Sequence, residues 1–302
     1  MFYIQQIAVF MRHILIIGAG RSASSLIQYL LNKSEEENLH LTIGDLSLEL
    51  AEKKTKNHKN ATAIAFDVYN PEQRKIEIQK ADIVISMLPA FMHIEVAKDC
   101  IKYKKHMVTA SYISDAMQSL DEEAKANNLV FMNEIGLDPG IDHMSAMKVI
   151  DEIRDKGGKI ILFESFCGGL VAPESDNNLW NYKFTWNPRN VVLAGQGGVA
   201  KFIQEGTYKY IPYNKLFRRT EFMEVEGYGR FEGYANRDSL KYRSVYGLDD
   251  VLTLYRGTIR RVGFSKAWNM FVTLGMTDDS YTLDDSVNRT YREFTNHFFP
   301  SH

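Results

Sequence analysis

A glycine-rich turn near the start of the chain has the residue types that bind a dinucleotide. The hexapeptide 18–23, GAGRSA, directly follows the β-branched run Ile14–Ile17 and precedes a helical pattern that begins near Ser24. Its two glycines permit a tight turn and let backbone N–H groups approach a pyrophosphate at the positive end of the helix, and Ala23 supplies a small residue for packing. A plain strand-to-helix turn is the alternative. The residues expected to contact a dinucleotide here are Gly18, Gly20, Arg21 and Ser22.

An aspartate stands where such a site meets the adenosine ribose. Asp45 ends the second β-branched run, and the acidic insert Asn32–Asn38 explains its slightly long separation from the glycine turn. A carboxylate in this place accepts hydrogen bonds from ribose hydroxyls and repels a 2′-phosphate, so the expected cofactor is NAD, with NADP bound more weakly. The alternative is a helix N-cap, a role that Asp45 and Ser47 both suit.

Three further segments place polar residues at strand ends. The segment Ile83–Pro89 is a buried strand followed by a proline, with Ser86 as its small polar residue, and it is expected to run beside the nicotinamide ribose. Val108–Tyr112 repeats that pattern, and turn-forming strand ends are the alternative for both. The polar loop 133–143 contains Pro139 and Gly140, which fix a turn. In this loop Asp142 can cap the next helix, and Asp138 is expected to point toward the cleft between the domains unless it only stabilises the turn.

These residues need a sheet to position them. From Arg12 onward, short β-branched runs alternate with amphipathic segments, which is the pattern of βαβ units. The expected strands are His13–Ile17, Leu39–Gly44, Thr62–Phe66, Ile83–Met87, His106–Ala110 and Leu129–Met132. They predict an α/β fold with a doubly wound parallel (Rossmann) sheet. A helix over Ile141–Asp155, a strand over Lys159–Phe166 and later strand-like segments then predict an α+β substrate domain.

The expected domains are an N-terminal extension over residues 1–11, a dinucleotide-binding domain over 12–135 and a substrate-binding domain over 136–302. The start of the chain, Met1–Phe10, lacks the basic residues of a signal peptide and is interpreted as a translation-start artefact. The chain has 36 Lys and Arg against 38 Asp and Glu, a formal charge of −2, which disfavours nucleic acid and membrane partners. Two cysteines and no metal-ligand spacing among eight histidines favour a soluble cytoplasmic protein without a metal.

Seven longer motifs occur between Arg12 and about Gly275. They are 85–89 (ISMLP), 107–112 (MVTASY), 134–143 (EIGLDPGIDH), 166–174 (FCGGLVAPE), 182–186 (YKFTW), 234–239 (YANRDS) and 254–260 (LYRGTIR). In this order they resemble the glutamate-forming saccharopine dehydrogenases, or saccharopine reductases, of lysine metabolism. So many long motifs in one order make the resemblance specific.

The resemblance implies an enzyme that oxidises the secondary amine of saccharopine with a nicotinamide cofactor, after which the imine is hydrolysed to L-glutamate and 2-aminoadipate 6-semialdehyde. Saccharopine is then the partner, and a homodimer is left open. The positions that match substrate contacts of the family are Ser111, Tyr112, Arg237, Thr258, Ile259 and Arg260. Those that match cofactor contacts are Leu88, Pro89 and Asp138, with Val68 and the adjacent Asp67 at the adenine.

The chemistry of the residues agrees with this substrate. Saccharopine carries three carboxylates, which planar arginine side chains bind well, and the segment Lys215–Arg261 holds ten basic residues against seven acidic ones. Arg237 and Arg260 are the expected carboxylate ligands, and solvated surface arginines are the alternative for most of the others.

Hydride loss from a C–N bond also needs a base. The candidates are Asp138, Tyr112 and Cys167, with His143 a weaker one. A small buried cysteine is the alternative for Cys167, and a structural helix-start histidine is the alternative for His143.

The chain departs from the resemblance at its end, Phe298–His302, because family members continue into a segment that returns to the nucleotide domain. Low or no saccharopine turnover is therefore expected, since the cleft would lack one wall. The alternatives to an active saccharopine dehydrogenase are a noncatalytic remnant that keeps the nucleotide fold and an oxidoreductase for another secondary-amine conjugate.

Overall fold

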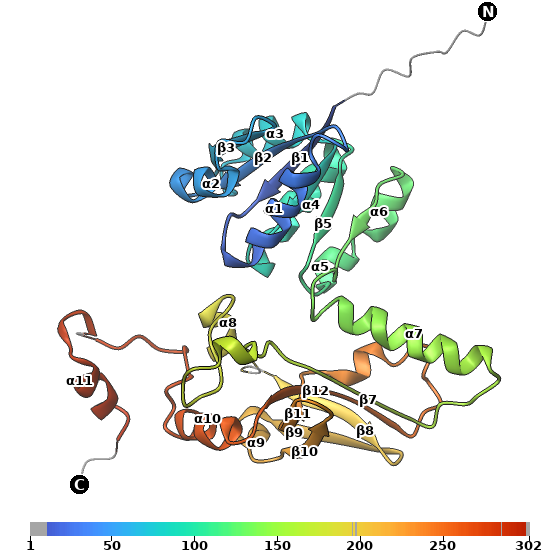
Figure 1. Cartoon of the computed structure of the whole chain (residues 1–302), viewed down its shortest axis with the longest axis vertical. Helices are drawn as coiled ribbons and strands as arrows, with labels where there is room; N and C mark the ends of the chain where they lie inside the picture. The colour runs from blue at the N-terminus through green and yellow to red at the C-terminus, as the bar shows by residue number, and fades with distance from the viewer. Residues whose placement is uncertain (1–10, 195, 197, 285, 300–302) are drawn as a thin grey trace, which may run out of the picture. The chain divides into compact units, whose positions relative to one another are not determined.

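The computed structural model describes residues 11–194, 196, 198–284 and 286–299, and the chain divides into two compact units that join between His143 and Met144 (Figure 1). The expected N-terminal extension lies outside the described residues, except for Met11. Within the described ranges, no helix is long and apolar enough to cross a membrane. The same ranges contain no group of three or more His, Cys, Asp or Glu side chains that could hold a metal ion.

The first unit is built on a six-stranded parallel sheet. Its strands are β1 (Arg12–Ile17), β2 (Leu39–Asp45), β3 (Ala61–Ala65), β4 (Ile83–Ser86), β5 (His106–Thr109) and β6 (Phe131–Met132). Their order is β3-β2-β1-β4-β5-β6, so the winding reverses between β1 and β4. This topology confirms the doubly wound sheet, in which ligands bind outside the carboxyl ends of the strands at the point of reversal.

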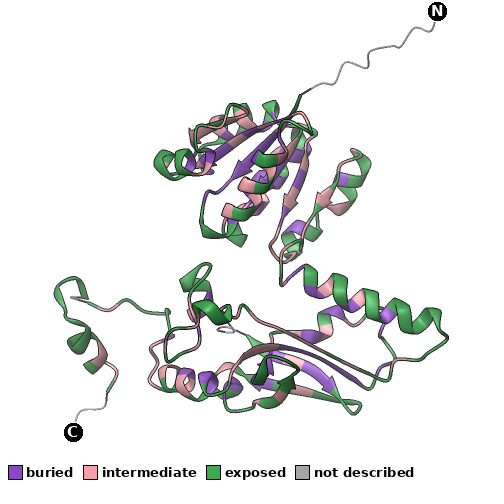
Figure 2. Ribbon diagram, viewed as in Figure 1, coloured by how far each residue is buried: buried purple, intermediate pink, exposed green. Residues whose placement is uncertain are grey.

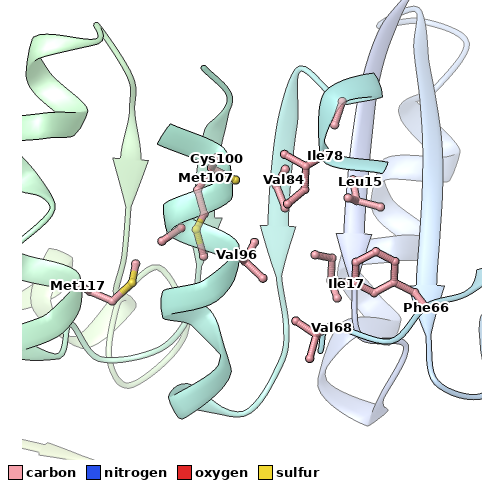
Figure 3. Packing of buried hydrophobic residues seen from close by; sticks show 12 residues of the cluster. Leu15, Ile17, Phe66, Val68, Ile78, Val84, Val96, Cys100, Met107 and Met117 are labelled. Atoms are coloured by element: carbon pink, nitrogen blue, oxygen red, sulfur yellow. The ribbon is translucent and has the colours of Figure 1, made fainter. Parts of the chain in front are cut away.

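Both faces of this sheet are buried, as a parallel sheet requires. Along β1, Leu15 and Ile17 belong to one apolar cluster, shown in Figure 3, and Ile14 and Ile16 belong to a second. Because successive side chains of a strand point to opposite faces, the two clusters lie on the two sides of the sheet. In Figure 2 the buried residues accordingly follow the strands, and the exposed ones lie on the outer faces of the helices.

Short helices connect the strands. They are η1 (Arg21–Ala23), α1 (Ser24–Lys33), α2 (Leu48–Thr55), α3 (Pro71–Lys80), η2 (Ala90–Met92), α4 (His93–Lys102), α5 (Asp115–Gln118) and α6 (Asp121–Ala126), followed by α7 (Ile141–Asp155). Helix α2 begins after Ser47, whose hydroxyl accepts a hydrogen bond from the N–H of Leu50. Helix α3 begins after Asn70 in the same way and has a proline in its first turn. Such caps satisfy backbone donors that a helix leaves unpaired at its start.

A buried arginine ties α3 to α4. Arg74 is 7% exposed, and its Nε donates to the Asp99 carboxylate at 2.7 Å. Its Nη1 also donates to the carbonyl oxygen of Val68, in the loop between β3 and α3. The arginine thus holds that loop against the helical layer.

We expect Arg74→Met to lower the free energy of unfolding by about 3 kcal/mol, because it leaves the Asp99 carboxylate half-buried without its cation. The measurement is urea denaturation followed by circular dichroism. Lys98→Met is the matched control: Lys98 pairs with Glu95 on the surface of α4, and its loss should change the unfolding free energy by less than about 0.5 kcal/mol. Equal effects of the two substitutions would contradict the prediction.

The second unit contains a separate sheet that is mostly antiparallel. Its strands are β7 (Leu162–Cys167), β8 (Val199–Gln204), β9 (Thr207–Pro212), β10 (Glu221–Val225), β11 (Gly229–Ala235) and β12 (Thr253–Arg261). The order is β10-β11-β12-β8-β9, and β7 pairs with β12 in parallel. The helices of this unit are η3 (Pro173–Ser175), α8 (Pro188–Val192), α9 (Tyr213–Leu216), η4 (Ser239–Tyr242), α10 (Phe264–Thr273), η5 (Ser286–Asn288) and α11 (Tyr291–Asn296). This mixture confirms the expected α+β second domain.

The core of the second unit is aromatic. Tyr234, Tyr255 and Trp268 are among its buried residues. Helix α10 is fixed to the sheet by Glu232 of β11, a buried carboxylate that accepts hydrogen bonds from the backbone N–H groups of Gly263 and Ser265. A negative charge at a helix start is stabilised by the helix dipole, so this contact anchors α10 next to β12.

Candidate functional site

The glycine turn has the backbone of a phosphate-binding loop. Gly18 has φ +106°, and a Cβ atom there would lie 2.9 Å from the carbonyl oxygen of Met87, so the fold itself requires glycine. Gly20 differs, because its φ is −64° and a Cβ atom would meet nothing within 4 Å. The turn leads through η1 into α1. Within η1, Arg21 and Ser22 are exposed and Ala23 is buried. The open space at Gly20, at the start of a helix, fits a pyrophosphate.

Asp45 does not present its carboxylate as expected. One carboxylate oxygen accepts a hydrogen bond from the N–H of Ala19 at 2.8 Å, and the other accepts one from the N–H of Ser47 at 3.0 Å. The carboxylate therefore fixes the glycine turn to the loop before α2. The N-cap of α2 is Ser47, not Asp45.

A buried histidine joins the carboxyl ends of β4 and β5. His93, the first residue of α4, has Nδ1 2.8 Å from the Ser86 hydroxyl and Nε2 2.7 Å from the Ser111 hydroxyl. Nε2 also lies 3.2 Å from the hydroxyl of Thr109. Burial lowers the pKa of His93 to about 4, so the ring is neutral near pH 7.

Sequence reasoning identified Ser86 and Ser111 but missed His93. Ser86 is fully buried, with its hydroxyl on the histidine, and Ser111 is half-buried. A signal existed: two neighbouring buried strands end in hydroxyl residues that need partners, and the helix between them begins with a histidine.

Tyr112 and Asp138 form a direct pair beyond the ends of β5 and β6. The Tyr112 hydroxyl donates a hydrogen bond of 2.5 Å to the Asp138 carboxylate, and both side chains are half-buried. The loop that carries Asp138 is closed by backbone contact, since a Cβ atom on Gly140 would lie 2.2 Å from the carbonyl oxygen of Gly136. Asp142 accepts a hydrogen bond from the N–H of Gly140, so it stabilises this turn. The chain thus brings a proton donor and a carboxylate together at the edge where ligands bind.

His143 lies beside a different carboxylate. Its Nε2 is 3.2 Å from Glu134, and Glu134 also accepts a hydrogen bond from the N–H of Ile113. These contacts connect the start of α7 to the segment after β5, in agreement with a structural role for His143.

The remaining candidates of the first unit differ in exposure. Asp67 is exposed and accepts a hydrogen bond from the N–H of Tyr69, whereas Val68 is 6% exposed and belongs to the core cluster of Figure 3. Leu88 packs against the same cluster, and Pro89, which precedes η2, is exposed.

In the second unit, Cys167 and Thr258 are opposite each other on β7 and β12. Cys167 is half-buried and is not part of a disulfide. The next residue, Gly168, lies so close to β12 that a Cβ atom there would be 2.3 Å from the carbonyl oxygen of Ile259 and 2.9 Å from Nη1 of Arg260. The structure therefore brings together four of the candidates, Cys167, Thr258, Ile259 and Arg260.

The Arg260 guanidinium stacks on aromatic rings. Its Cζ lies 4.9 Å from the ring centre of Tyr182 and 5.3 Å from that of Phe264. Nη1 donates to the carbonyl oxygen of Ile259, and the buried Nε has no hydrogen-bond partner among the described residues. Tyr182 and Phe264 also line an apolar cavity of about 350 Å³. Stacking fixes the plane of the guanidinium, which suits bidentate binding of a carboxylate.

Arg237 lies elsewhere on the same sheet. It follows β11 with φ +44°, and its side chain is exposed. The N–H of the preceding Asn236 bonds to the carbonyl oxygen of Arg256, so Arg237 stands near Tyr255 of β12. At about 3.4 Å per residue, roughly 17 Å of strand separates that point from Arg260. The register therefore does not place the two arginines side by side.

Comparison with known proteins identifies the family of the chain. A family model described as the saccharopine dehydrogenase NADP binding domain matches residues 14–132, and one described as the saccharopine dehydrogenase C-terminal domain matches residues 136–302. The chain belongs to the saccharopine dehydrogenase family. This confirms the resemblance that the seven motifs indicated.

Members of the saccharopine dehydrogenase family align with most of this chain. Saccharopine dehydrogenase [NADP(+), L-glutamate-forming] of Pyricularia oryzae is 37% identical over 268 residues, which are 89% of this chain and 58% of that protein. The alpha-aminoadipic semialdehyde synthase of Arabidopsis thaliana is 36% identical over 88% of this chain and 27% of its own length. The structure of apo saccharopine dehydrogenase (L-Glu forming) from Saccharomyces cerevisiae is similar, with a TM-score of 0.79 and 34% identity over 90% of this chain and 60% of that one. The chain thus spans less than two thirds of the length of each of these relatives.

The expectation that NAD is the preferred cofactor is wrong. The matching family model is described as NADP-binding, and the similar fungal enzymes are named as NADP(+) enzymes. The expectation rested on the Asp45 carboxylate, which would accept hydrogen bonds from the ribose and repel a 2′-phosphate. In the structure each Asp45 oxygen accepts a backbone hydrogen bond, so the carboxylate fixes the glycine turn in this fold.

Proposed function

We propose that this chain catalyses the NADP-dependent oxidation of saccharopine to L-glutamate and 2-aminoadipate 6-semialdehyde. The observation that carries the proposal is the hydrogen bond between Tyr112 and Asp138, in a family member, at the sheet edge that also carries the glycine turn. When bound, NADP supplies the acceptor for the hydride that leaves the C–N carbon. Gly18, Gly20 and the start of α1 would hold its pyrophosphate.

The proton chemistry is proposed for the pair of Tyr112 and Asp138. The substrate ammonium must lose a proton before hydride can leave, and the imine must later receive activated water. The Asp138 carboxylate can accept a proton, and the Tyr112 hydroxyl fixes the direction of that carboxylate by donating to it. Cys167 remains a second candidate base, since its thiol lies beside Thr258 on the other unit.

The carboxylates of saccharopine are proposed to bind to arginine. Arg260 is half-buried, and its guanidinium is held by stacking on Tyr182 and Phe264, so its orientation is fixed before an anion binds. Arg237 is exposed, and a substrate of saccharopine's length offers carboxylates at separate points along the chain. The separation of the two arginines on the sheet is compatible with each of them binding a different carboxylate.

The test of this function is the absorbance of NADPH formed when purified protein is given saccharopine and NADP. We expect saccharopine-dependent NADPH formation, with glutamate among the products, and such a rate would contradict the low or absent turnover that the sequence alone predicts. NADPH formation from other secondary-amine conjugates but not from saccharopine would assign the chain to a different substrate. Absence of any turnover together with tight NADPH binding would indicate the noncatalytic alternative.

Replacing Arg260 by lysine should raise the KM for saccharopine by about tenfold or more, because lysine keeps the charge but loses the planar fork. The dissociation constant for NADPH should not change. Arg261→Lys is the matched control, since Arg261 is the next residue on β12 and bonds instead to the carbonyl oxygen of Tyr228. An unchanged KM in the Arg260 variant would mean that this guanidinium only packs against its rings.

A further inference from the structure

A line of hydrogen-bonding groups runs from the core of the first unit to its surface. It begins at Ser86, which is fully buried, passes through His93, which is 2% exposed, and ends at the half-buried Ser111. The two ring nitrogens of His93 lie 2.8 Å and 2.7 Å from the hydroxyls of Ser86 and Ser111. Nothing in the proposed chemistry uses this buried imidazole, and Ser111 is one of the residues that match substrate contacts.

The neutral imidazole has two tautomers, which give Ser111 opposite roles. A neutral ring has one N–H donor and one bare nitrogen acceptor. If the proton is on Nδ1, the bare Nε2 must accept from Ser111, which then turns its hydrogen inward. If the proton is on Nε2, the ring donates to Ser111, and the Ser111 hydroxyl keeps its hydrogen for another acceptor.

The partners of the ring favour the proton on Nε2. Among the described residues, the Ser86 hydroxyl has no side-chain or backbone partner except Nδ1 of His93, so its hydrogen finds an acceptor only if Nδ1 is bare. The other tautomer would leave that hydrogen unpaired in the core and would also make Ser111 and Thr109 compete for one lone pair. With the proton on Nε2, the ring donates to Ser111 at 2.7 Å, and the buried Thr109 hydroxyl, whose oxygen accepts from the N–H of Ser111, loses the ring as an acceptor for its hydrogen. This tautomer is still the favoured one, because it gives up only the long 3.2 Å contact of Thr109, whereas a proton on Nδ1 leaves the Ser86 hydrogen unpaired and makes two hydroxyls compete for Nε2.

We infer that His93 is a positioning residue, which fixes the Ser111 hydroxyl as a hydrogen-bond donor toward a carboxylate of the substrate. The inference rests on the proposed function for the identity of that carboxylate. The tautomer does not depend on the proposed function, because it follows from the contacts of the ring with Ser86, Ser111 and Thr109. His93 acts through Ser111 and does not touch the substrate.

The first test is the ring ¹⁵N spectrum of His93, assigned by the signal that disappears in His93→Gln. We expect a protonated Nε2 and a bare Nδ1, unchanged between about pH 6 and 8 because the pKa of the buried ring is about 4. We also expect the Nε2 signal to shift when saccharopine is added. A protonated Nδ1, or titration of the ring in this range, would overturn the inference whatever the activity of the protein.

The second test compares His93→Gln with His93→Leu. Glutamine can place an N–H near the position of Nε2, whereas leucine of similar size cannot donate. The leucine variant should raise the KM for saccharopine by about tenfold, the effect of one lost hydrogen bond, with kcat within about twofold. The glutamine variant should restore the KM to within about threefold of the unmodified protein.

His40→Leu is the matched control. His40 of β2 also bonds a hydroxyl, that of Thr62 at 3.0 Å, but it lies at the start of its strand, away from the carboxyl edge. Its loss should leave the KM unchanged. Equal KM changes in the leucine and glutamine variants, or a change only in melting temperature, would assign His93 a purely structural role. If the unmodified protein does not oxidise saccharopine, the proposed function fails, and the ring spectrum still decides the tautomer.

Discussion

Asp138→Asn is expected to lower kcat for saccharopine oxidation by roughly two to four orders of magnitude, the usual contribution of a positioned base. Asparagine has the same shape and still accepts the hydrogen bond from Tyr112, but its amide cannot take a proton. The loss should therefore appear in kcat, with little change in NADPH affinity or in unfolding free energy. The measurement is the initial rate of NADPH formation at saturating substrate.

Two matched variants separate the candidates for this role. Asp142→Asn changes the neighbouring carboxylate of the same loop, which accepts a hydrogen bond from the N–H of Gly140, and it should keep kcat within about threefold. Cys167→Ser tests the other unit. A near-normal rate for Asp138→Asn together with a large loss for Cys167→Ser would place the proton acceptor at the thiol.

The second large effect is expected at the glycine turn. Gly20→Ala should weaken NADPH binding at least tenfold, because its new methyl group would occupy the open space that a pyrophosphate needs. Its backbone angles are accessible to alanine, so the unfolding free energy should change by less than about 0.5 kcal/mol. Fluorescence titration with NADPH and urea denaturation measure the two quantities.

Gly18→Ala is the comparison that makes this specific. Because Gly18 has φ +106° and lies close to Met87, Gly18→Ala should lower the free energy of unfolding by about 2 kcal/mol or more. It should also weaken NADPH binding. The two variants would then differ in unfolding free energy, and both would bind NADPH more weakly than the unmodified protein. Unchanged NADPH affinity in Gly20→Ala would contradict a dinucleotide site at this turn.

Local sequence predicted the sheet well because its signals are local. Each strand of the first unit is a short β-branched run, and the doubly wound order follows from their alternation with helices. The helix Ile141–Asp155 has the predicted bounds, and the strand after it lies at Leu162–Cys167, slightly later than the predicted Lys159–Phe166. The bounds of this strand, β7, depend on its pairing with β12, which is distant in sequence.

The sequence predicted which residues make up the candidate site, but it did not predict which of their side chains touch. The glycine turn, the Asp138 loop and the motif 254–260 were identifiable because each combines unusual residues within a few positions. Side-chain direction was not identifiable. Asp45 was expected to face a ribose, and in the fold its carboxylate accepts hydrogen bonds from two backbone N–H groups.

The sequence by itself determined the family, the strand–helix alternation and the residue types at the carboxyl edge of the sheet, because these depend on neighbours in the chain. Only the tertiary structure decided which of those residues touch. It joined Tyr112 to Asp138, placed His93 between Ser86 and Ser111, and put Arg237 and Arg260 at separate points of one sheet. The physical reason is that a hydrogen bond forms only when two atoms from different strands and helices lie at the right separation to within a few tenths of an ångström, and sequence spacing does not fix that separation.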